Sequence, residues 1–163
     1  MAKYYQNHNL KDLSIKEIEE AITNLSDSLH LNLLRASVTR LDIGSNIELN
    51  NPIANYLELL DTCENFKKVK IMAESVNYIP ATKRVNRLRE LIFYDKAKEC
   101  IDKSDPHSYL VVGANLMRYE LKLMNKLPQQ LKQSKIDGKT LFQESFYTSM
   151  ISYWADWYSK ISK

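Results

Sequence analysis

The sequence predicts an α+β fold in which an antiparallel or mixed sheet packs against helices on one of its faces. Apolar residues recur at helical spacing near both ends of the chain, and alternating, β-branched stretches fill its middle. Only three glycines and four prolines interrupt the 163 residues, and no change of composition marks a boundary. We therefore expect a single domain over residues 1–163 that ends in a helix over residues 140–163.

The first predicted element is a helix over residues 13–31, LSIKEIEEAITNLSDSLHL. Ser14 and Glu17 have the spacing of a capping box, in which each side chain hydrogen-bonds the other residue's backbone. Apolar residues follow at helical spacing and form one stripe, made by Ile15, Ile18, Ile22, Leu25 and Leu29. A second helix is predicted to begin at Asn51-Pro52, because proline is tolerated in a first turn.

Alternation and β-branched residues predict the strands. Residues 36–45 form the first candidate, and residues 67–71, 75–79 and 88–94 form the next three. Residues 116–123, with the sequence LMRYELKL, alternate most regularly. The turn between the third and fourth candidates, ATKRVNR, is polar and basic.

The C-terminal stretch is predicted to form an amphipathic helix. From about Thr140 onward, large apolar residues recur at every fourth position, at Phe142, Phe146, Met150 and Trp154. Trp154 and Trp157 would face the same way, which indicates a core or subunit contact rather than base stacking.

Composition and charge bound the possible functions. Hydrophobic residues make up 44% of the chain and charged residues 26%, which excludes a disordered chain. No apolar run approaches the roughly 18 residues of a membrane span, and the start lacks a signal peptide, so we expect a cytoplasmic protein without a membrane partner. Cys63 and Cys100 stand alone, which predicts free thiols rather than a disulfide or a zinc site. A net charge of +3 permits a nucleic-acid partner without indicating one.

Three of the predicted strands carry functional groups on one face, because residues two apart on a strand point the same way. The first strand places Arg40 with Asp42, an R-x-D pattern. The fourth strand, in the stretch RELIFYDK, places Tyr94 with Lys96 on one face, a Y-x-K pattern. The last strand has the pattern R-x-E, formed by Arg118 and Glu120.

This set of groups suits phosphate chemistry. Asp42 and Glu120 are hard oxygen ligands of the kind that Mg²⁺ or Mn²⁺ prefers. Tyr94 belongs to the side-chain types that form covalent intermediates. The cations that would hold phosphate oxygens on the strands are Arg40, Lys96 and Arg118.

The basic turn before Tyr94 would follow a nucleic-acid backbone beside such a site. Its cations are Lys83, Arg84, Arg87 and Arg89. The alternative is an ordinary solvated sheet face on which arginines pair with carboxylates across strands. The residues alone leave both interpretations open.

Four stretches, taken together and in this order, resemble a known family. They are NLSDSLHLNL, ASVTRLDIGSNIEL, RELIFYDKAKEC and NLMRYELKL. They resemble the phage and plasmid replication proteins of the filamentous-phage gene II/X type, which are similar to the wider group of rolling-circle replication initiators. The resemblance runs from about Ala2 to the C-terminus.

The resemblance implies an enzyme that nicks single-stranded or origin DNA with a divalent metal, Mg²⁺ or Mn²⁺. The tyrosine of the Y-x-K motif, which falls on Tyr94, would form a 5′-phosphotyrosyl link and free a 3′-hydroxyl that primes replication. Lys96 would assist it, and the R-x-D and R-x-E motifs would complete the site. The alternatives are a non-catalytic DNA-binding or regulatory fragment of such a protein, and an interaction protein whose charged sheet face binds no nucleic acid.

Two features depart from the family pattern. The paired histidines of the broader nicking superfamily are missing, because His8, His30 and His107 do not cluster in the sequence. His30 is expected to be structural, at the end of the first helix. The chain also begins late in the family pattern, so we expect a fragment, an internally initiated form or an N-terminally shortened member. A sheet without its first strands could lose a metal ligand.

Overall fold

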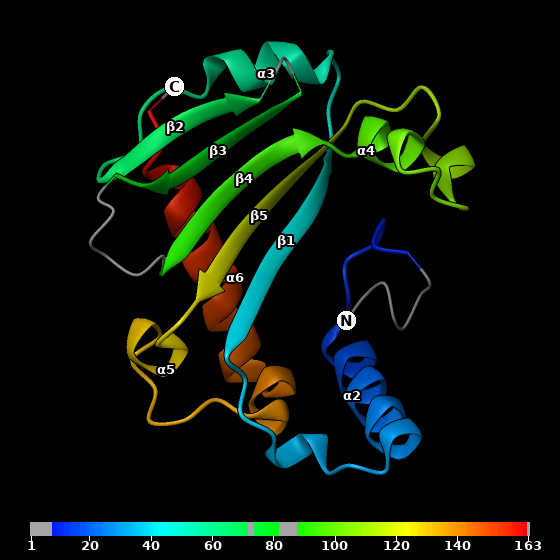
Figure 1. Ribbon diagram of the computed structural model, residues 1–163, viewed down its shortest axis with the longest axis vertical. Helices are drawn as coiled ribbons and strands as arrows, with labels where there is room; N and C mark the ends of the chain where they lie inside the picture. Colours follow the sequence, from blue (N-terminus) through cyan, green and yellow to red (C-terminus); the bar gives the residue numbers. More distant parts are fainter. Residues whose placement is uncertain (1–7, 72–73, 82–87, 163) are drawn as a thin grey trace.

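The computed structural model describes residues 8–71, 74–81 and 88–162, and it confirms the α+β prediction. One antiparallel sheet has the strand order β1-β5-β4-β3-β2 and lies at the centre of the molecule (Figure 1). Strands β2 to β5 are neighbours both along the chain and in the sheet, and β1 lies beside β5 at the far edge. The strands are β1 (Arg40–Glu48), β2 (Phe66–Ile71), β3 (Ser75–Pro80), β4 (Arg89–Asp95) and β5 (Leu116–Met124).

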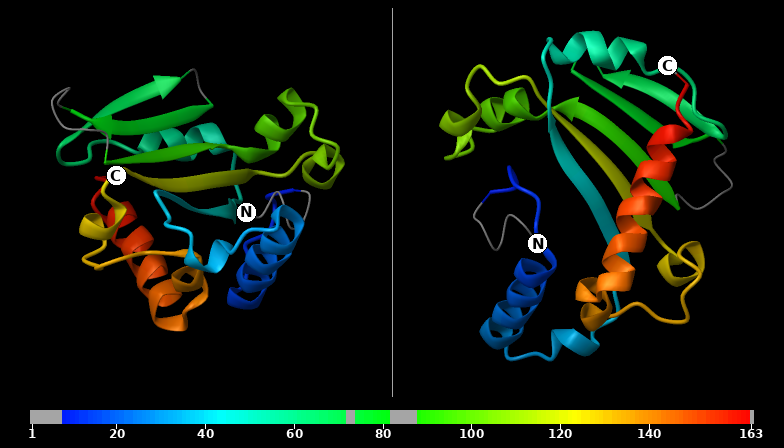
Figure 2. Two further views of the ribbon diagram at one scale, coloured as in Figure 1. Left: turned by 60° about the horizontal axis from the view of Figure 1, so that its bottom comes forward. Right: turned by 180° about the vertical axis from the view of Figure 1, so that it is seen from behind.

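The longest helix, α6 (Glu144–Ser159), crosses the back of the sheet, as Figure 2 shows from behind. The first helix of the described residues, α2 (Ile15–Leu29), lies at the β1 edge and has the predicted capping box between Ser14 and Glu17. The other α-helices in the described part of the chain are α3 (Ile53–Leu59), α4 (Lys96–Asp102) and α5 (Leu127–Gln130). Among the described residues, none of the helices combines the length and apolar character that crossing a bilayer requires.

The core lies between α6 and one face of the sheet. Phe93 and Tyr119 are fully buried there, and their rings stack with centroids 4.5 Å apart. Trp154 covers Tyr119 from α6, with centroids 4.6 Å apart. Burying each such side chain contributes about 1.5–3 kcal/mol, so this face fixes the alternation of β4 and β5. The opposite face is consequently left to the polar residues of both strands.

Several predicted boundaries differ from the structure. The C-terminal helix, predicted over residues 140–163, is α6 over Glu144–Ser159, because a 3₁₀ helix over Gly138–Phe142, capped by Asp137, precedes it. The first strand begins at Arg40 rather than at residue 36, because Ser37 and Val38 pair instead with residues 136–137, through an isolated bridge and a backbone hydrogen bond. The fourth strand ends at Asp95, whose carboxylate accepts a hydrogen bond of 2.9 Å from the backbone N–H of Lys98. That cap begins α4, a helix that alternation did not predict.

Candidate active site

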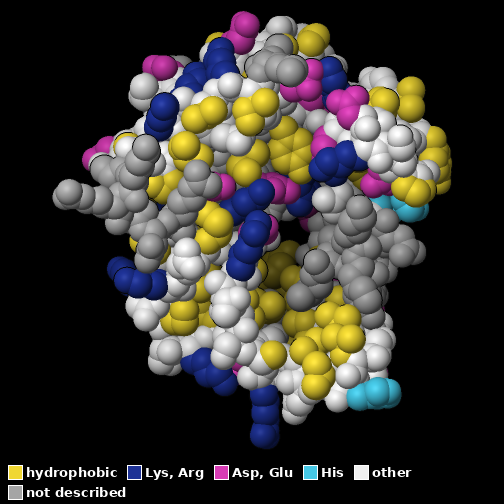
Figure 3. Space-filling view, in the orientation of Figure 1, with side chains coloured by type: hydrophobic (Ala, Val, Ile, Leu, Met, Phe, Trp, Pro, Cys, Tyr) yellow, Lys and Arg dark blue, Asp and Glu magenta, His cyan; other side chains and the backbone are white. Residues whose placement is uncertain are grey.

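The R-x-D motif, the R-x-E motif and Tyr94 lie on adjacent strands and share the face of the sheet opposite α6, which we call the polar face. On β5, Arg118 lies opposite Tyr94 of β4, and Glu120 lies opposite Gly44 of β1. Lys122 of β5 lies opposite Asp42 of β1. Charged side chains gather over the middle of this face (Figure 3). The structure therefore places the R-x-D motif, the R-x-E motif and Tyr94 on one face of the sheet, as the alternation of the strands predicted.

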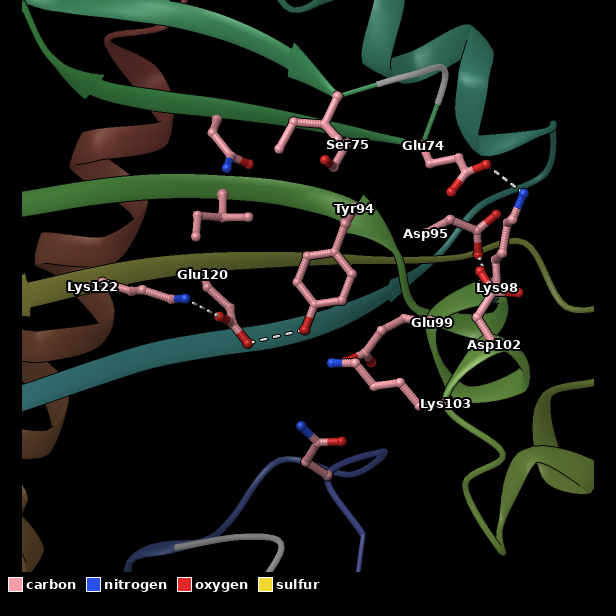
Figure 4. Close-up of a pocket in the computed structure, with 14 residues that line it drawn as sticks. Glu74, Ser75, Tyr94, Asp95, Lys98, Glu99, Asp102, Lys103, Glu120 and Lys122 are labelled. Atoms are coloured by element: carbon pink, nitrogen blue, oxygen red, sulfur yellow. Dashed lines mark hydrogen bonds and ion pairs between the residues drawn. The ribbon is translucent and has the colours of Figure 1, made fainter.

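Tyr94 and Glu120 form the central contact of the polar face. The Tyr94 hydroxyl donates a hydrogen bond of 3.1 Å to Oε1 of Glu120 (Figure 4). The same carboxylate accepts from Nε of Arg118 at 2.6 Å, and Nζ of Lys122 lies 3.6 Å from its Oε2. Glu120 has a side-chain exposure of only 14%, so these cations compensate a largely buried charge.

Burial raises the pKa of Tyr94 well above its ordinary value near 10, and the negative charge of Glu120 raises it further. Arg118 opposes this rise without cancelling it. The phenol is therefore protonated at neutral pH, and a base is needed to make it nucleophilic. Glu120 is the group in hydrogen-bond contact with that proton.

Arg118 is held on its other side by the edge of the sheet. Its Nη1 donates to Oδ1 of Asn46 at 3.1 Å and to the backbone carbonyl of Asn9 at 3.3 Å. Asn46 also donates to that carbonyl, at 2.9 Å. These contacts fix the guanidinium over the β1–β5 pair.

Gly44 makes room for this arrangement. A Cβ at this position would lie 2.9 Å from Cγ of Glu120 and 3.0 Å from Nη2 of Arg118. Both distances are shorter than ordinary van der Waals contact, so any side chain here would displace the two charged groups. The sequence motifs did not reveal the contributions of Gly44 and Asn46.

Arg40 and Asp42 form a separate pair on β1. Nε and Nη2 of Arg40 donate to the two carboxylate oxygens of Asp42 at 2.8 and 2.7 Å. Their side chains are 56% and 38% exposed. The Asp42 carboxylate thus lies at the solvent edge of the polar face, on the strand next to Glu120.

The predicted metal ligands, Asp42 and Glu120, therefore share a face without forming a cluster. Within residues 8–71, 74–81 and 88–162, no group of three or more His, Cys, Asp or Glu side chains converges as a metal site would require. Since the oxygens of Asp42 bind Arg40 and those of Glu120 contact Tyr94, Arg118 and Lys122, these residues do not fit a complete metal site. Metal binding stays a prediction.

Lys96 does not share the polar face with Tyr94, which corrects the strand-based expectation. Because β4 ends at Asp95, Lys96 is the first residue of α4, and its side chain is only 3% exposed. Its ammonium group instead contacts Glu99.

Arg89 also lies away from the polar face. Its Nη1 donates to the Tyr153 hydroxyl at 3.1 Å, and its guanidinium lies 4.6 Å from the ring centroid of Trp157, on the α6 side of the sheet. The other predicted cations of the basic turn, Lys83, Arg84 and Arg87, fall outside the described residues.

The histidines do not join the polar face. His8 and His107 form an edge-to-face ring pair with centroids 5.1 Å apart. His30 ends α2 in a left-handed conformation, which agrees with the expected structural role.

A cavity of about 530 Å³ opens beside Tyr94 between the polar face and α4. Figure 4 shows the side chains around it. Its charged lining residues are Glu74, Asp95, Lys98, Glu99, Asp102, Lys103, Glu120 and Lys122. The strand alternation did not predict that α4 lines this cavity. The K-x-x-E-x-x-x-K spacing of Lys96, Glu99 and Lys103, which is typical of one helix face, was the available signal.

A protein-family model for the N-terminal part of the phage replication-associated protein of gene II matches residues 1–160. The chain belongs to this family. The resemblance to the filamentous-phage gene II replication proteins is thereby confirmed, and the chain is a replication-associated protein of the initiator type. No curated protein and no solved structure showed significant similarity to this replication-associated protein.

Proposed function

We propose that this replication-associated protein starts replication by nicking single-stranded or origin DNA, with Tyr94 as the nucleophile. The observation that supports the proposal is the 3.1 Å hydrogen bond from the Tyr94 hydroxyl to Glu120, beside Arg118 on a polar sheet face. Among the described tyrosines, Tyr78 and Tyr119 are fully buried on the opposite face, so neither has comparable access to DNA.

In the proposed step Glu120 accepts the phenolic proton while the Tyr94 oxygen attacks phosphorus. The new bond is a 5′-phosphotyrosyl ester, and the bond that breaks is the one from phosphorus to the 3′-oxygen. That oxygen leaves and takes a proton from solvent, which gives the 3′-hydroxyl that primes synthesis. Protonation of Glu120 weakens its ion pair with Arg118, whose guanidinium is then available to the charge that develops on the phosphate.

The requirement for Mg²⁺ or Mn²⁺ is proposed from the family resemblance alone. Asp42 and Glu120 are the carboxylates that the R-x-D and R-x-E motifs assign to the ion. Because they do not form a ligand cluster, we assign no step to the metal. Adduct formation with and without added Mn²⁺, after treatment with a chelator, tests the requirement.

The deciding experiment incubates the protein with Mn²⁺ and labelled single strands that cover the replicon, followed by denaturing electrophoresis. We expect a covalent protein–DNA adduct that disappears in Tyr94→Phe. The matched control is Tyr109→Phe, because Tyr109 is 69% exposed and lies away from the cavity. An adduct that persists in Tyr94→Phe would assign the nucleophile to another residue.

A second candidate is a DNA-binding regulatory module without nicking activity. It is favoured by one feature, that Arg40 and Arg118 are already engaged by carboxylates. In that case the same strands would bind in a salt-sensitive manner and no adduct would form in the wild-type protein.

A further inference from the structure

Helix α4 carries a series of three paired charged side chains, Lys96, Glu99 and Lys103, that leads toward Tyr94. The Lys96 ammonium contacts Oε2 of Glu99, and Nζ of Lys103 lies 2.6 Å from Oε1 of the same carboxylate. The side-chain exposure rises along this series, from 3% for Lys96 to 24% for Glu99 and 70% for Lys103. Glu99 is thus held by the buried Lys96 and in turn holds Lys103, which lines the cavity.

Lys96, at the buried end of this series, needs a partner, because an ammonium group removed from water is costly unless a carboxylate neutralises it. Burial alone would raise the pKa of Glu99, but hydrogen bonds from Lys103 and Lys96 outweigh burial and lower that pKa. Glu99 is therefore a fixed negative charge. Lys96, which the sequence predicted beside Tyr94, instead donates a hydrogen bond to the Glu99 carboxylate from the protein interior.

Lys103, at the exposed end of this series, lies near Tyr94. Glu99 and Lys103 line the same cavity as Tyr94 and Glu120. Figure 4 shows Glu99 and Lys103 on the side of the Tyr94 hydroxyl opposite Lys122. The charge of Glu99 contributes to the raised pKa of Tyr94, and the charge of Glu120 contributes to the raised pKa of Lys103, which agrees with this closeness.

The cations near Tyr94 differ in their freedom to bind a phosphate. Arg118 is 13% exposed and donates to Glu120, Asn46 and the backbone of Asn9. Lys103 is 70% exposed, and an ammonium group has three donors, which leaves donors for a ligand after Glu99 is satisfied.

We propose that Lys103 binds a non-bridging oxygen of the phosphate that Tyr94 attacks, with Glu99 and Lys96 as positioning residues. The inference rests on the proposed nicking function and adds a phosphate-binding residue from α4 to the sheet motifs. An ammonium group is a common phosphate ligand, and here it would approach the phosphate from the α4 side while Arg118 remains on the β1 side.

The test uses Tyr94→Phe protein, so that binding is measured without cleavage. A single strand is scanned with one neutral methylphosphonate linkage at a time, and the dissociation constants are compared for Lys103 and Lys103→Met. We expect one linkage whose neutralisation weakens binding about fivefold with Lys103 and hardly at all with Lys103→Met. The matched control is Lys16→Met, since Lys16 is an exposed lysine of α2 that pairs with Glu20 and does not line the cavity.

The outcomes separate this inference from the proposed function. The role of Lys103 is refuted if no linkage loses its effect on binding in Lys103→Met, or if Lys16→Met abolishes that effect as Lys103→Met does. If one linkage couples and the protein with Tyr94 forms its adduct at that linkage, the inference is supported. If one linkage couples but the adduct forms elsewhere, Lys103 does not hold the attacked phosphate. If one linkage couples and the wild type forms no adduct, phosphate binding by Lys103 stands and the nicking function fails.

The positioning role of Glu99 has its own readout. Glu99 raises the pKa of Lys103, so in Glu99→Gln the lysine should lose its charge, and the coupling to the linkage, at a lower alkaline pH. A purely structural role for Glu99 would leave that pH unchanged in the folded variant. Lys103→Arg should retain the coupling, because the guanidinium keeps the positive charge.

Discussion

Two pairs on neighbouring strands have the same sequence pattern but different surroundings. Arg40 and Asp42 on β1 bind each other with two short hydrogen bonds and remain 56% and 38% exposed. Arg118 and Glu120 on β5 are 13% and 14% exposed, and Glu120 also accepts a hydrogen bond from Tyr94. Strand β1 is the edge of the sheet, whereas β5 has a neighbour on each side.

The difference shows that the position of a strand in the sheet decides what a charged motif can do. On β5, the carboxylate is surrounded by Tyr94 of β4 and by Arg118 and Lys122 of its own strand, so its charge acts on Tyr94 through a poorly solvated contact. On the edge strand, water screens the pair and its contribution to stability is small. We therefore expect the R-x-E motif to matter more for both chemistry and folding.

The largest expected effect comes from removing each carboxylate in turn. Glu120→Gln should slow adduct formation by about 10²–10⁴-fold, because the base in contact with the Tyr94 proton is lost. Asp42→Asn should slow it by less than about tenfold if its charge acts only through solvent. Single-turnover adduct formation measures both rates. Equal losses in the two variants would show instead that both carboxylates serve one metal site.

The arginines should differ in stability. Arg118→Met leaves Glu120 largely buried without its closest cation, so we expect the free energy of unfolding to fall by about 3–5 kcal/mol. Arg40→Met breaks an exposed pair and should cost about 1 kcal/mol or less. Urea unfolding compares the two variants. A loss below about 1 kcal/mol for Arg118→Met would contradict the buried character of the β5 pair.

Much of this contrast could be predicted from the sequence and part could not. Period-two alternation identified β4 and β5, because the apolar residues of these strands pack on α6 and force Tyr94, Arg118 and Glu120 to the other face. The order of strands does not follow from alternation. The sequence therefore did not distinguish the edge strand, with Arg40 and Asp42, from a central one.

The errors at Lys96 and Arg89 have local causes. Lys96 was assigned to a strand because strand parity was extended past Asp95, whose carboxylate caps α4 and ends the alternation. Arg89 was predicted as a cation of the basic turn, but it is the first residue of β4 and has the parity of the buried residues of that strand. It reaches the α6 side because Tyr153 and Trp157 offer a hydroxyl and an aromatic face for its guanidinium.

Gly44 offers a way to alter the β5 pair from the edge strand. Gly44→Ala would place a methyl group about 2.9 Å from Glu120 Cγ, so we expect a loss of about 1–3 kcal/mol in the free energy of unfolding. Adduct formation should slow as well, because Glu120 would shift away from Tyr94. The control is Glu48→Ala, an exposed position on the same strand. An unchanged adduct rate in a folded Gly44→Ala protein would show that Glu120 tolerates displacement.

The smallest expected effect is on the alkaline stability of the folded state. The pKa of Tyr94 is raised by burial and by Glu120, so the folded protein holds the phenolic proton more tightly than the unfolded chain does. The resulting stability is complete below about pH 10, the ordinary pKa of tyrosine, and is lost as the pH rises above it. Wild type should therefore lose more stability than Tyr94→Phe between about pH 9 and 10.5, by about 1 kcal/mol or less, in urea unfolding. Since burial is the main cause of the raised pKa and persists in Glu120→Gln, that variant should reduce this difference only slightly, whereas Asp42→Asn should leave it unchanged. If Asp42→Asn had the larger effect, the electrostatic distinction between the two strands would be refuted.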